Sequence, residues 1–334
     1  MLTVTLYTRK NCGLCNDAKA ELAALEKELP HRLVEVDIES DPALLKKYLV
    51  SIPVLEIGPY TLTAPITKEQ LRMTLSAASD RRGQLEQIGG SAYEARVRRG
   101  QEITNSDRVS YWISRHYLLL LNLFMFFYVG LPFLAPTLMK AGIDLPARAI
   151  YTIYSPLCHQ FGFRSFFLYG EQAVYPLKEA GITGVQTFEQ ITGLENLSNP
   201  NSITRLQARQ FIGDETIGYK VALCERDVAM YFGLLLFGLI FGLANRRIPP
   251  LHWALWLFIG IGPIGLDGFS QLLSQFNFSW LSTILAYRES TPFLRVLTGT
   301  LFGLSTAWFA YPYIEESMAE TRQFFIKKFA VSRN

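Results

Sequence analysis

The apolar and polar residues of the first 80 positions follow two different periods. Some stretches are apolar or alternate apolar and polar residues, as β-strands do, whereas others repeat alanine and leucine every three or four positions, as helices do. The predicted strands include 2–7, 33–38 and 51–57, and the predicted helices include 15–29 and 42–48. Residues 1–80 are therefore predicted to form one α/β domain.

After residue 116 the pattern changes to long apolar stretches. A bilayer core of ~30 Å is crossed by about 20 apolar helical residues, and four stretches approach or reach that length. They are 117–138, 228–244, 251–266 and 293–311. Residues 117–334 are therefore predicted to form an all-α polytopic membrane domain of about four transmembrane helices.

Three segments between these stretches are more polar. Residues 81–116 are basic and broken by glycine, which predicts a linker. Residues 147–167 are apolar but carry charged residues, which predicts an amphipathic or re-entrant helix and not a fifth span. Residues 171–220 are predicted to be an extracytoplasmic insertion with short helices.

The basic residues set the expected orientation. Arg115, Arg246–Arg247 and Lys327–Lys328 flank the first, second and fourth stretches, and such clusters favour the cytoplasmic side. The first residues are predicted to be a strand and not a signal peptide. We therefore expect a protein of the bacterial inner membrane with both termini in the cytoplasm.

Composition agrees with a membrane protein. Hydrophobic residues make up 49% of the chain and charged residues 18%, against about 25% charged in soluble domains. The net charge of +3 is too small to indicate nucleic-acid binding. The lipid bilayer is the expected partner.

Two cysteines near the N-terminus carry the clearest chemistry. Cys12 and Cys15 lie between a predicted strand and a predicted helix, which is the arrangement of a thioredoxin-like redox site. The helix N-terminus, Arg9 and Lys10 favour a thiolate at Cys12, and the thiolate is the nucleophile of disulfide exchange. The alternative is an inert or metal-binding pair, but a zinc ribbon requires a second pair nearby, which the sequence lacks.

The same region resembles the small bacterial glutaredoxin-like proteins. The resemblance rests on Tyr7-Thr8, Cys12-x-x-Cys15 and Ile52-Pro53-Val54. It implies that Cys12 attacks, Cys15 resolves the mixed disulfide, and Pro53 is the cis-proline that faces them. Residues 60–69 depart from the family, because they lack the Gly-Gly-x-Asp-type turn that holds glutathione.

The predicted membrane domain gathers polar residues at the outer ends of its apolar stretches. Ionisable residues beside a span are costly and are usually paired, so Asp227 or Asp267 is expected to pair with Arg226, Arg288 or Arg295. The candidate outer-face cluster is His159, Gln160, Arg164, Arg226, Asp227, Asp267, Arg288 and Arg295.

These residues also resemble a bacterial family of predicted membrane proteins of unknown function. The matching motifs are Cys158-His159-Gln160, Arg164-Ser165-Phe166, Cys224-x-Arg226, Asp267-Gly268, Arg288-Glu289-Ser290 and Arg295-x-x-Thr298-Gly299. Asp227 is a departure, since many relatives have cysteine there. The resemblance implies architecture and no settled activity.

Three interpretations of Cys158 and Cys224 remain open. They form a disulfide, structural or redox-active, because the compartment they face is oxidising. They are free buried thiols. They bind a metal together with His159 and Asp227.

The favoured hypothesis is a membrane-bound thiol-disulfide oxidoreductase that couples Cys12 and Cys15 to a second pair, Cys158 and Cys224. A thiol or disulfide of a protein or a small molecule would be its partner. No cofactor is certain, and quinone and glutathione are the two candidates. The alternative is a membrane binding or transport protein whose glutaredoxin-like domain regulates it or docks a partner.

Overall fold

The computed structural model describes residues 1–198, 203–275 and 287–333. It divides the chain into two compact units. The first contains residues 1–117 together with 316–334, and the second contains residues 118–315. Residues 199–202, which fall in the expected insertion, lie outside the described ranges.

The first unit is built on a four-stranded sheet with the order β2-β1-β3-β4. The central strand β1 pairs in parallel with β2 and antiparallel with β3, which pairs antiparallel with β4. The strands are β1 (Leu2–Thr8), β2 (His31–Asp37), β3 (Val54–Ile57) and β4 (Tyr60–Thr63). The last five residues of β1 are all buried. Because successive side chains of a strand point to opposite faces, both faces of β1 are therefore covered.

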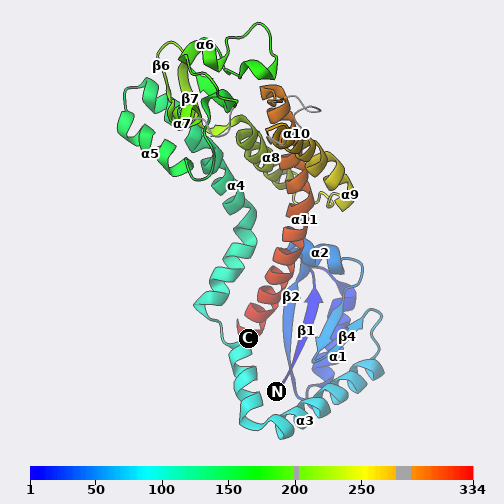
Figure 1. Cartoon of the computed structure of the whole chain (residues 1–334). Coiled ribbons are helices and arrows are strands. Elements are labelled where there is room, and N and C mark those ends of the chain that lie inside the picture. The colour runs from blue at the N-terminus through cyan, green and yellow to red at the C-terminus, as the bar shows by residue number, and fades with distance from the viewer. Residues whose placement is uncertain (199–202, 276–286, 334) are drawn as a thin grey trace. The chain divides into compact units, whose positions relative to one another are not determined.

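Helices cover both faces of this sheet (Figure 1). Helices α1 (Gly13–Leu25) and α3 (Lys68–Gln101) pack against one face through Leu22, Leu71 and neighbouring leucines. On the other face, α2 (Pro42–Tyr48) shares a cluster with Ile326 and Ala330, which lie near the end of α11 (Pro292–Arg333). The C-terminal residues of the chain thus complete the core of the N-terminal domain.

The segment 81–116 is largely helical. Helix α3 continues to Gln101, with a kink at Gly90, and α4 (Asn105–Lys140) begins after a short break. The compact unit therefore extends beyond the boundary at residue 80 that the composition suggested.

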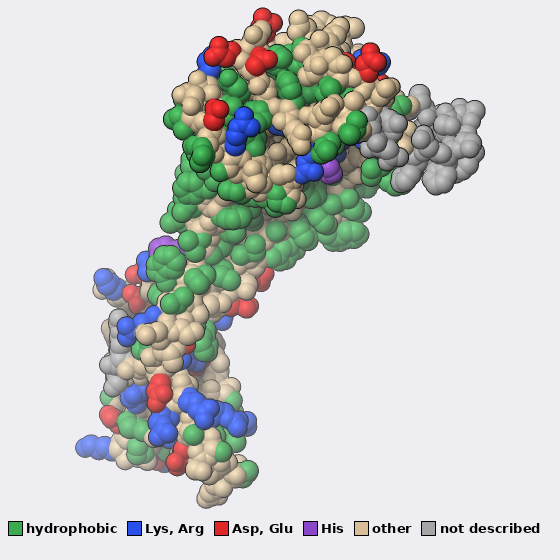
Figure 2. Space-filling model, turned by 60° about the vertical axis from the view of Figure 1, so that its left-hand side comes forward, with side chains coloured by type: hydrophobic (Ala, Val, Ile, Leu, Met, Phe, Trp, Pro, Cys, Tyr) green, Lys and Arg blue, Asp and Glu red, His purple; other side chains and the backbone are tan. Residues whose placement is uncertain are grey.

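The second unit contains most of the apolar helical residues. Within the described residues, four helical segments are long and apolar enough to cross a membrane, which agrees with the expected number. They are α4, α8 (Glu225–Leu243), the run of α9 (Trp253–Leu255), η4 (Trp256–Ile261) and α10 (Gly262–Gln275), and α11. Many large apolar side chains of these helices are exposed, and Figure 2 shows them gathered over this part of the chain. Such exposure suits contact with lipid.

A small antiparallel sheet with the order β5-β7-β6 accompanies these helices. The sequence did not indicate it. Its strands are β5 (Ser165–Leu168), β6 (Gly213–Asp214) and β7 (Gly218–Cys224), and the short helices around it are α5 (Asp144–Tyr154), η2 (Gly162–Arg164), η3 (Lys178–Ala180), α6 (Phe188–Thr192) and α7 (Ile203–Gln210).

The expectation of one helix over 147–167 is wrong. Helix α5 ends at Tyr154, and a turn, a short 3-10 helix and strand β5 follow it. Pro156 contributes to the ending, because it has no N–H to donate to the preceding turn, although Ser155 before it still has helical backbone. The segment therefore folds against the small sheet and is not a span.

Candidate functional site

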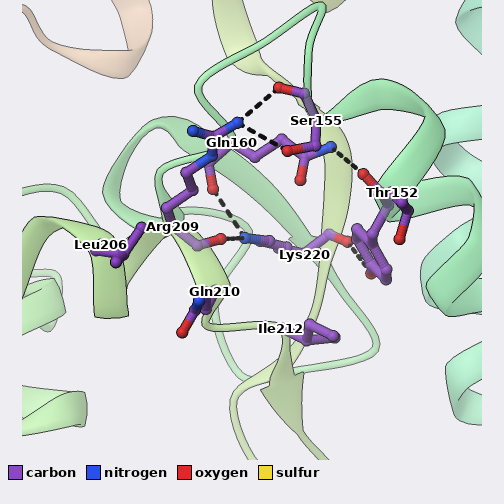
Figure 3. Close-up of a pocket in the computed structure, with 9 residues that line it drawn as sticks. Thr152, Ser155, Gln160, Leu206, Arg209, Gln210, Ile212 and Lys220 are labelled. Atoms are coloured by element: carbon purple, nitrogen blue, oxygen red, sulfur yellow. Dashed lines mark hydrogen bonds between the residues drawn. The ribbon is translucent and has the colours of Figure 1, made fainter.

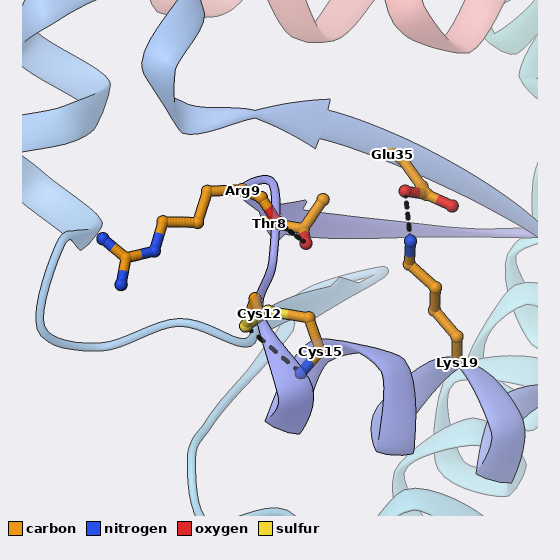
Figure 4. The surroundings of a disulfide bond; sticks show 6 residues. All are labelled: Thr8, Arg9, Cys12, Cys15, Lys19 and Glu35. Atoms are coloured by element: carbon orange, nitrogen blue, oxygen red, sulfur yellow. Dashed lines mark hydrogen bonds and ion pairs between the residues drawn. A yellow bond between two sulfur atoms is a disulfide. The ribbon is translucent and has the colours of Figure 1, made fainter.

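Cys12 and Cys15 lie at the N-terminus of α1 and form a disulfide (Figure 4). Cys12 is the N-cap of the helix, and its Sγ accepts a hydrogen bond from the backbone N–H of Cys15 at 3.2 Å. Cys12 is partly exposed, whereas Cys15 is fully buried. Of the two sulfur atoms, that of Cys12 is the one a partner can reach.

Two expectations concern the surroundings of this disulfide, namely a cis-proline and positive charge near Cys12. The Ile52–Pro53 peptide bond is cis, as expected. The Arg9 side chain extends away from the sulfur atoms (Figure 4), whereas Cys12 lies at the N-terminus of α1, whose partial positive charge favours a thiolate. One turn further along α1, Lys19 pairs with Glu35 at 2.6 Å.

The other two cysteines come together in the second unit. Cys158 follows α5, and Cys224 ends β7 and is the N-cap of α8. Both are free thiols. Their sulfur atoms and a carboxylate oxygen of Asp227 all lie within 4.8 Å of one another. The structure thus brings together a dithiol and a carboxylate.

Hydrogen bonds distinguish the two thiols. The Sγ of Cys158 accepts from the backbone N–H groups of Cys224 at 3.3 Å and Gln160 at 3.5 Å. The Sγ of Cys224 donates to Asp227 Oδ2 at 3.0 Å. The hydrogen bond with Cys158, burial and the nearby Asp227 carboxylate raise the pKa of the Cys224 thiol. Cys158 therefore occupies the position better suited to a thiolate.

A buried carboxylate, Glu289, organises one part of the polar cluster. Its oxygens accept from Arg164 at 2.7 and 2.9 Å, from Arg295 at 2.5 Å and from Gln271 at 2.8 Å. Burial is the largest single influence and raises the pKa of Glu289, but Arg164, Arg295 and Gln271 together hold it below its ordinary value. Arg295 also pairs with Glu225 at 3.1 Å.

Asp267 organises the other part. It accepts from Arg226 at 2.5 Å, from Arg288 at 2.7 Å and from Ser290 at 2.6 Å. Both carboxylates are thus paired with side chains of this chain, as expected for ionisable residues beside or within a span.

The expected pairs of Asp267 with Arg226 and Arg288 are confirmed. Arg295 instead pairs with Glu225 and Glu289, two acids that were not among the candidate residues. The sequence could have indicated both acids, since each is adjacent to a candidate arginine.

His159 and Gln160 are adjacent in the sequence but lie in different surroundings in the structure. His159 is exposed and stacks on Phe161, so it does not join the group formed by the two sulfur atoms and Asp227. Gln160 is buried, and its Nε2 donates to the carbonyls of Tyr151 and Ala222 at 2.9 Å each. Gln160 therefore connects α5 to β7.

Lys220 was not among the candidates. It is 1% exposed at the floor of a cavity of about 380 Å³, and its Nζ donates to the carbonyls of Gln160 at 2.8 Å and Arg209 at 2.5 Å (Figure 3). Burial lowers the pKa of this amine to about 7. The signal in the sequence was a lysine directly before the apolar run Val221–Leu223.

Comparison with known proteins matches both parts of the chain. A family model described as "Glutaredoxin-like domain (DUF836)" matches residues 3–76, and one described as "Predicted membrane protein (DUF2085)" matches residues 204–309. An uncharacterized protein of Methanocaldococcus jannaschii is 24% identical over 213 residues, which are 61% of this chain and 96% of that protein. No solved structure matches the chain. The protein therefore joins an N-terminal glutaredoxin-like domain to a C-terminal domain of a predicted membrane protein family.

Proposed function

We propose that the protein is a membrane-bound thiol-disulfide oxidoreductase that reacts through Cys12 and Cys15. The observation that carries the proposal is the disulfide at the start of α1, with a partly exposed Cys12 and a buried Cys15. An exposed thiolate at a helix N-terminus is the nucleophile that exchange requires.

In the reductive direction, the Cys12 thiolate attacks a substrate disulfide, forms a mixed disulfide and releases one substrate thiolate. The Cys15 thiolate then attacks Cys12 Sγ, which releases the second substrate thiol and leaves the Cys12–Cys15 disulfide. Two electrons pass from the pair to the substrate, and a protein dithiol or two small-molecule thiols, which are oxidised to a disulfide, restore the reduced pair.

We also propose Cys158 and Cys224 as a second redox pair, coupled to the first. Support comes from their proximity and from the hydrogen bonds that favour a thiolate at Cys158. In this proposal both termini lie in the cytoplasm of a bacterial cell and the second pair lies at the outer face of its inner membrane. A bilayer of ~30 Å then separates the pairs, so a carrier such as a quinone conveys electrons between them.

The first test is disulfide reduction by the full chain in detergent or nanodiscs. We expect reduction of a protein disulfide by the dithiol form, its loss in Cys12→Ser, and accumulation of a mixed disulfide with substrate in Cys15→Ser. The exposed substitution Ala77→Ser on α3 is the matched control and is expected to leave the rate unchanged.

Reduction at the wild-type rate in Cys12→Ser would contradict the proposal. A parallel assay with a glutathione mixed disulfide separates the two substrate classes. Because the turn typical of glutathione binding is absent, we expect the protein disulfide to be the better substrate.

A further inference from the structure

We infer that Cys158, Cys224 and Asp227 in their reduced state bind a divalent cation that prefers thiolate ligands, of the zinc class. Their three ligand atoms lie within 4.8 Å of one another. Two thiolates with one carboxylate are ligands that zinc accepts in proteins, and three protein ligands leave a fourth position open.

The elements around the site hold these ligands in place. Cys224 is the N-cap of α8 and Asp227 lies in the first turn of the same helix, so strand β7 and the helix fix both. Cys158 packs in the cluster that joins α5 to β7 and accepts two backbone N–H bonds. Such bonds to a ligand atom orient it and are typical of the surroundings of metal sites.

The distances require only small movements. Zinc lies about 2.3 Å from sulfur and about 2.0–2.2 Å from oxygen, so tetrahedral ligand atoms are roughly 3.3–3.8 Å apart. The Sγ of Cys224 and Oδ2 of Asp227 are already 3.0 Å apart, joined by the thiol proton. A divalent ion replaces that proton and the proton of Cys158 and holds the three groups at coordination distance.

Charge and access also fit. Two thiolates and a carboxylate carry a charge of −3, and a divalent cation leaves −1 beside the N-terminus of α8, which favours a net negative group. Cys158 is buried, whereas Cys224 and Asp227 are partly exposed. Two of the three ligand residues are therefore in contact with solvent.

This inference concerns the same two thiols that the proposed function treats as a second redox pair. They bind the metal ion only when they are reduced, because a disulfide leaves no thiolate to coordinate it. The inference does not depend on Cys12 or Cys15. The chain has four cysteines, so Cys12→Ser with Cys15→Ser leaves only the two thiols of the site.

The experiment uses this full-length double variant, reduced with a phosphine and titrated with cobalt(II). Labelling first establishes two reactive thiols per chain. We expect a thiolate-to-cobalt charge-transfer absorption that saturates at one equivalent. Adding Asp227→Asn, which keeps both thiols, should weaken cobalt binding by at least about tenfold. The exposed acid Glu215 provides the matched control, and Glu215→Gln should leave the affinity unchanged.

Absence of the charge-transfer absorption from a protein with two reactive thiols would overturn the inference. Equal cobalt affinity with Asp227→Asn would overturn it as well. The oxidoreductase proposal is tested separately, by the reduction of substrate disulfides through Cys12. Either proposal can therefore fail without affecting the test of the other.

Discussion

At the residue scale, Lys220 is a buried lysine whose pKa is strongly lowered. It lies in strand β7, and two carbonyl oxygens accept from its amine, yet burial lowers its pKa from 10.5 to about 7. Between these two values the unfolded chain holds a proton that the folded chain has lost. Stability therefore rises with pH through this window, by about 1.4 kcal/mol per pH unit at most.

We predict that Lys220→Met removes this dependence. Between pH 7 and about pH 10, the free energy of unfolding of the wild type should rise relative to that of the variant, because only the wild type sheds the buried charge. Thermal or chemical unfolding in detergent at several pH values measures the difference. Parallel curves for the two proteins would show that Lys220 does not titrate in this window.

At the scale of elements, glycines bring α8 and α11 together. A Cβ at Gly299 would lie 2.6 Å from the carbonyl oxygen of Arg226, and one at Gly303 would overlap that of Met230. On the facing helix, a Cβ at Gly233 would lie 2.9 Å from the backbone nitrogen of Leu304. Small residues four apart allow such close contact between helices in a membrane. This contact lies beside Arg226 of α8, which pairs with Asp267 in the polar cluster.

We predict that Gly303→Leu separates these helices and lowers stability by about 2 kcal/mol or more, because backbone atoms must move. The control is Gly265→Leu on α10, where a Cβ would meet nothing within 4 Å. Thermal unfolding in detergent compares the two. Equal loss in both variants would contradict a specific contact between α8 and α11.

Local patterns predicted the features that depend on neighbouring residues. The apolar stretches and the Cys12-x-x-Cys15 turn followed from sequence spacing, whereas the pairing of Asp267 with arginine followed from the expectation that ionisable residues beside a span are paired. The pairing of Arg295 with Glu225 and the burial of Lys220 were not predicted, because each depends on contacts between elements distant in the chain. Strand β5 was missed for the same reason, since its pairing partner β7 lies some 50 residues later.

At the scale of the whole chain, the first and last residues form one unit. Asp41 caps α2 through the N–H groups of Ala43 and Leu44 and also pairs with Arg322 of α11 at 2.8 Å. Both side chains are 6% exposed. The compact unit that holds the residues matched by the glutaredoxin-like model therefore also includes the C-terminal part of α11.

We predict that Arg322→Met destabilises this unit by about 3–5 kcal/mol, because it leaves the buried charge of Asp41 without its partner. Adding Asp41→Asn, which keeps a good N-cap, should restore part of the loss. Unfolding of the full chain by urea, followed by fluorescence, measures both. The exposed pair of Arg72 and Glu28 supplies the control, and Arg72→Met should cost less than about 1 kcal/mol. A similar loss in the two arginine variants would contradict the account.

The most direct test of coupling between the two cysteine pairs is thiol labelling with a mass tag in intact cells. The redox state of Cys158 and Cys224 is compared between the wild type and Cys12→Ser after acid quenching, which exposes all thiols. The account predicts that removing Cys12 shifts the ratio of dithiol to disulfide at the second pair. An identical ratio in the two proteins would contradict coupling and leave the second pair without a redox connection to the first.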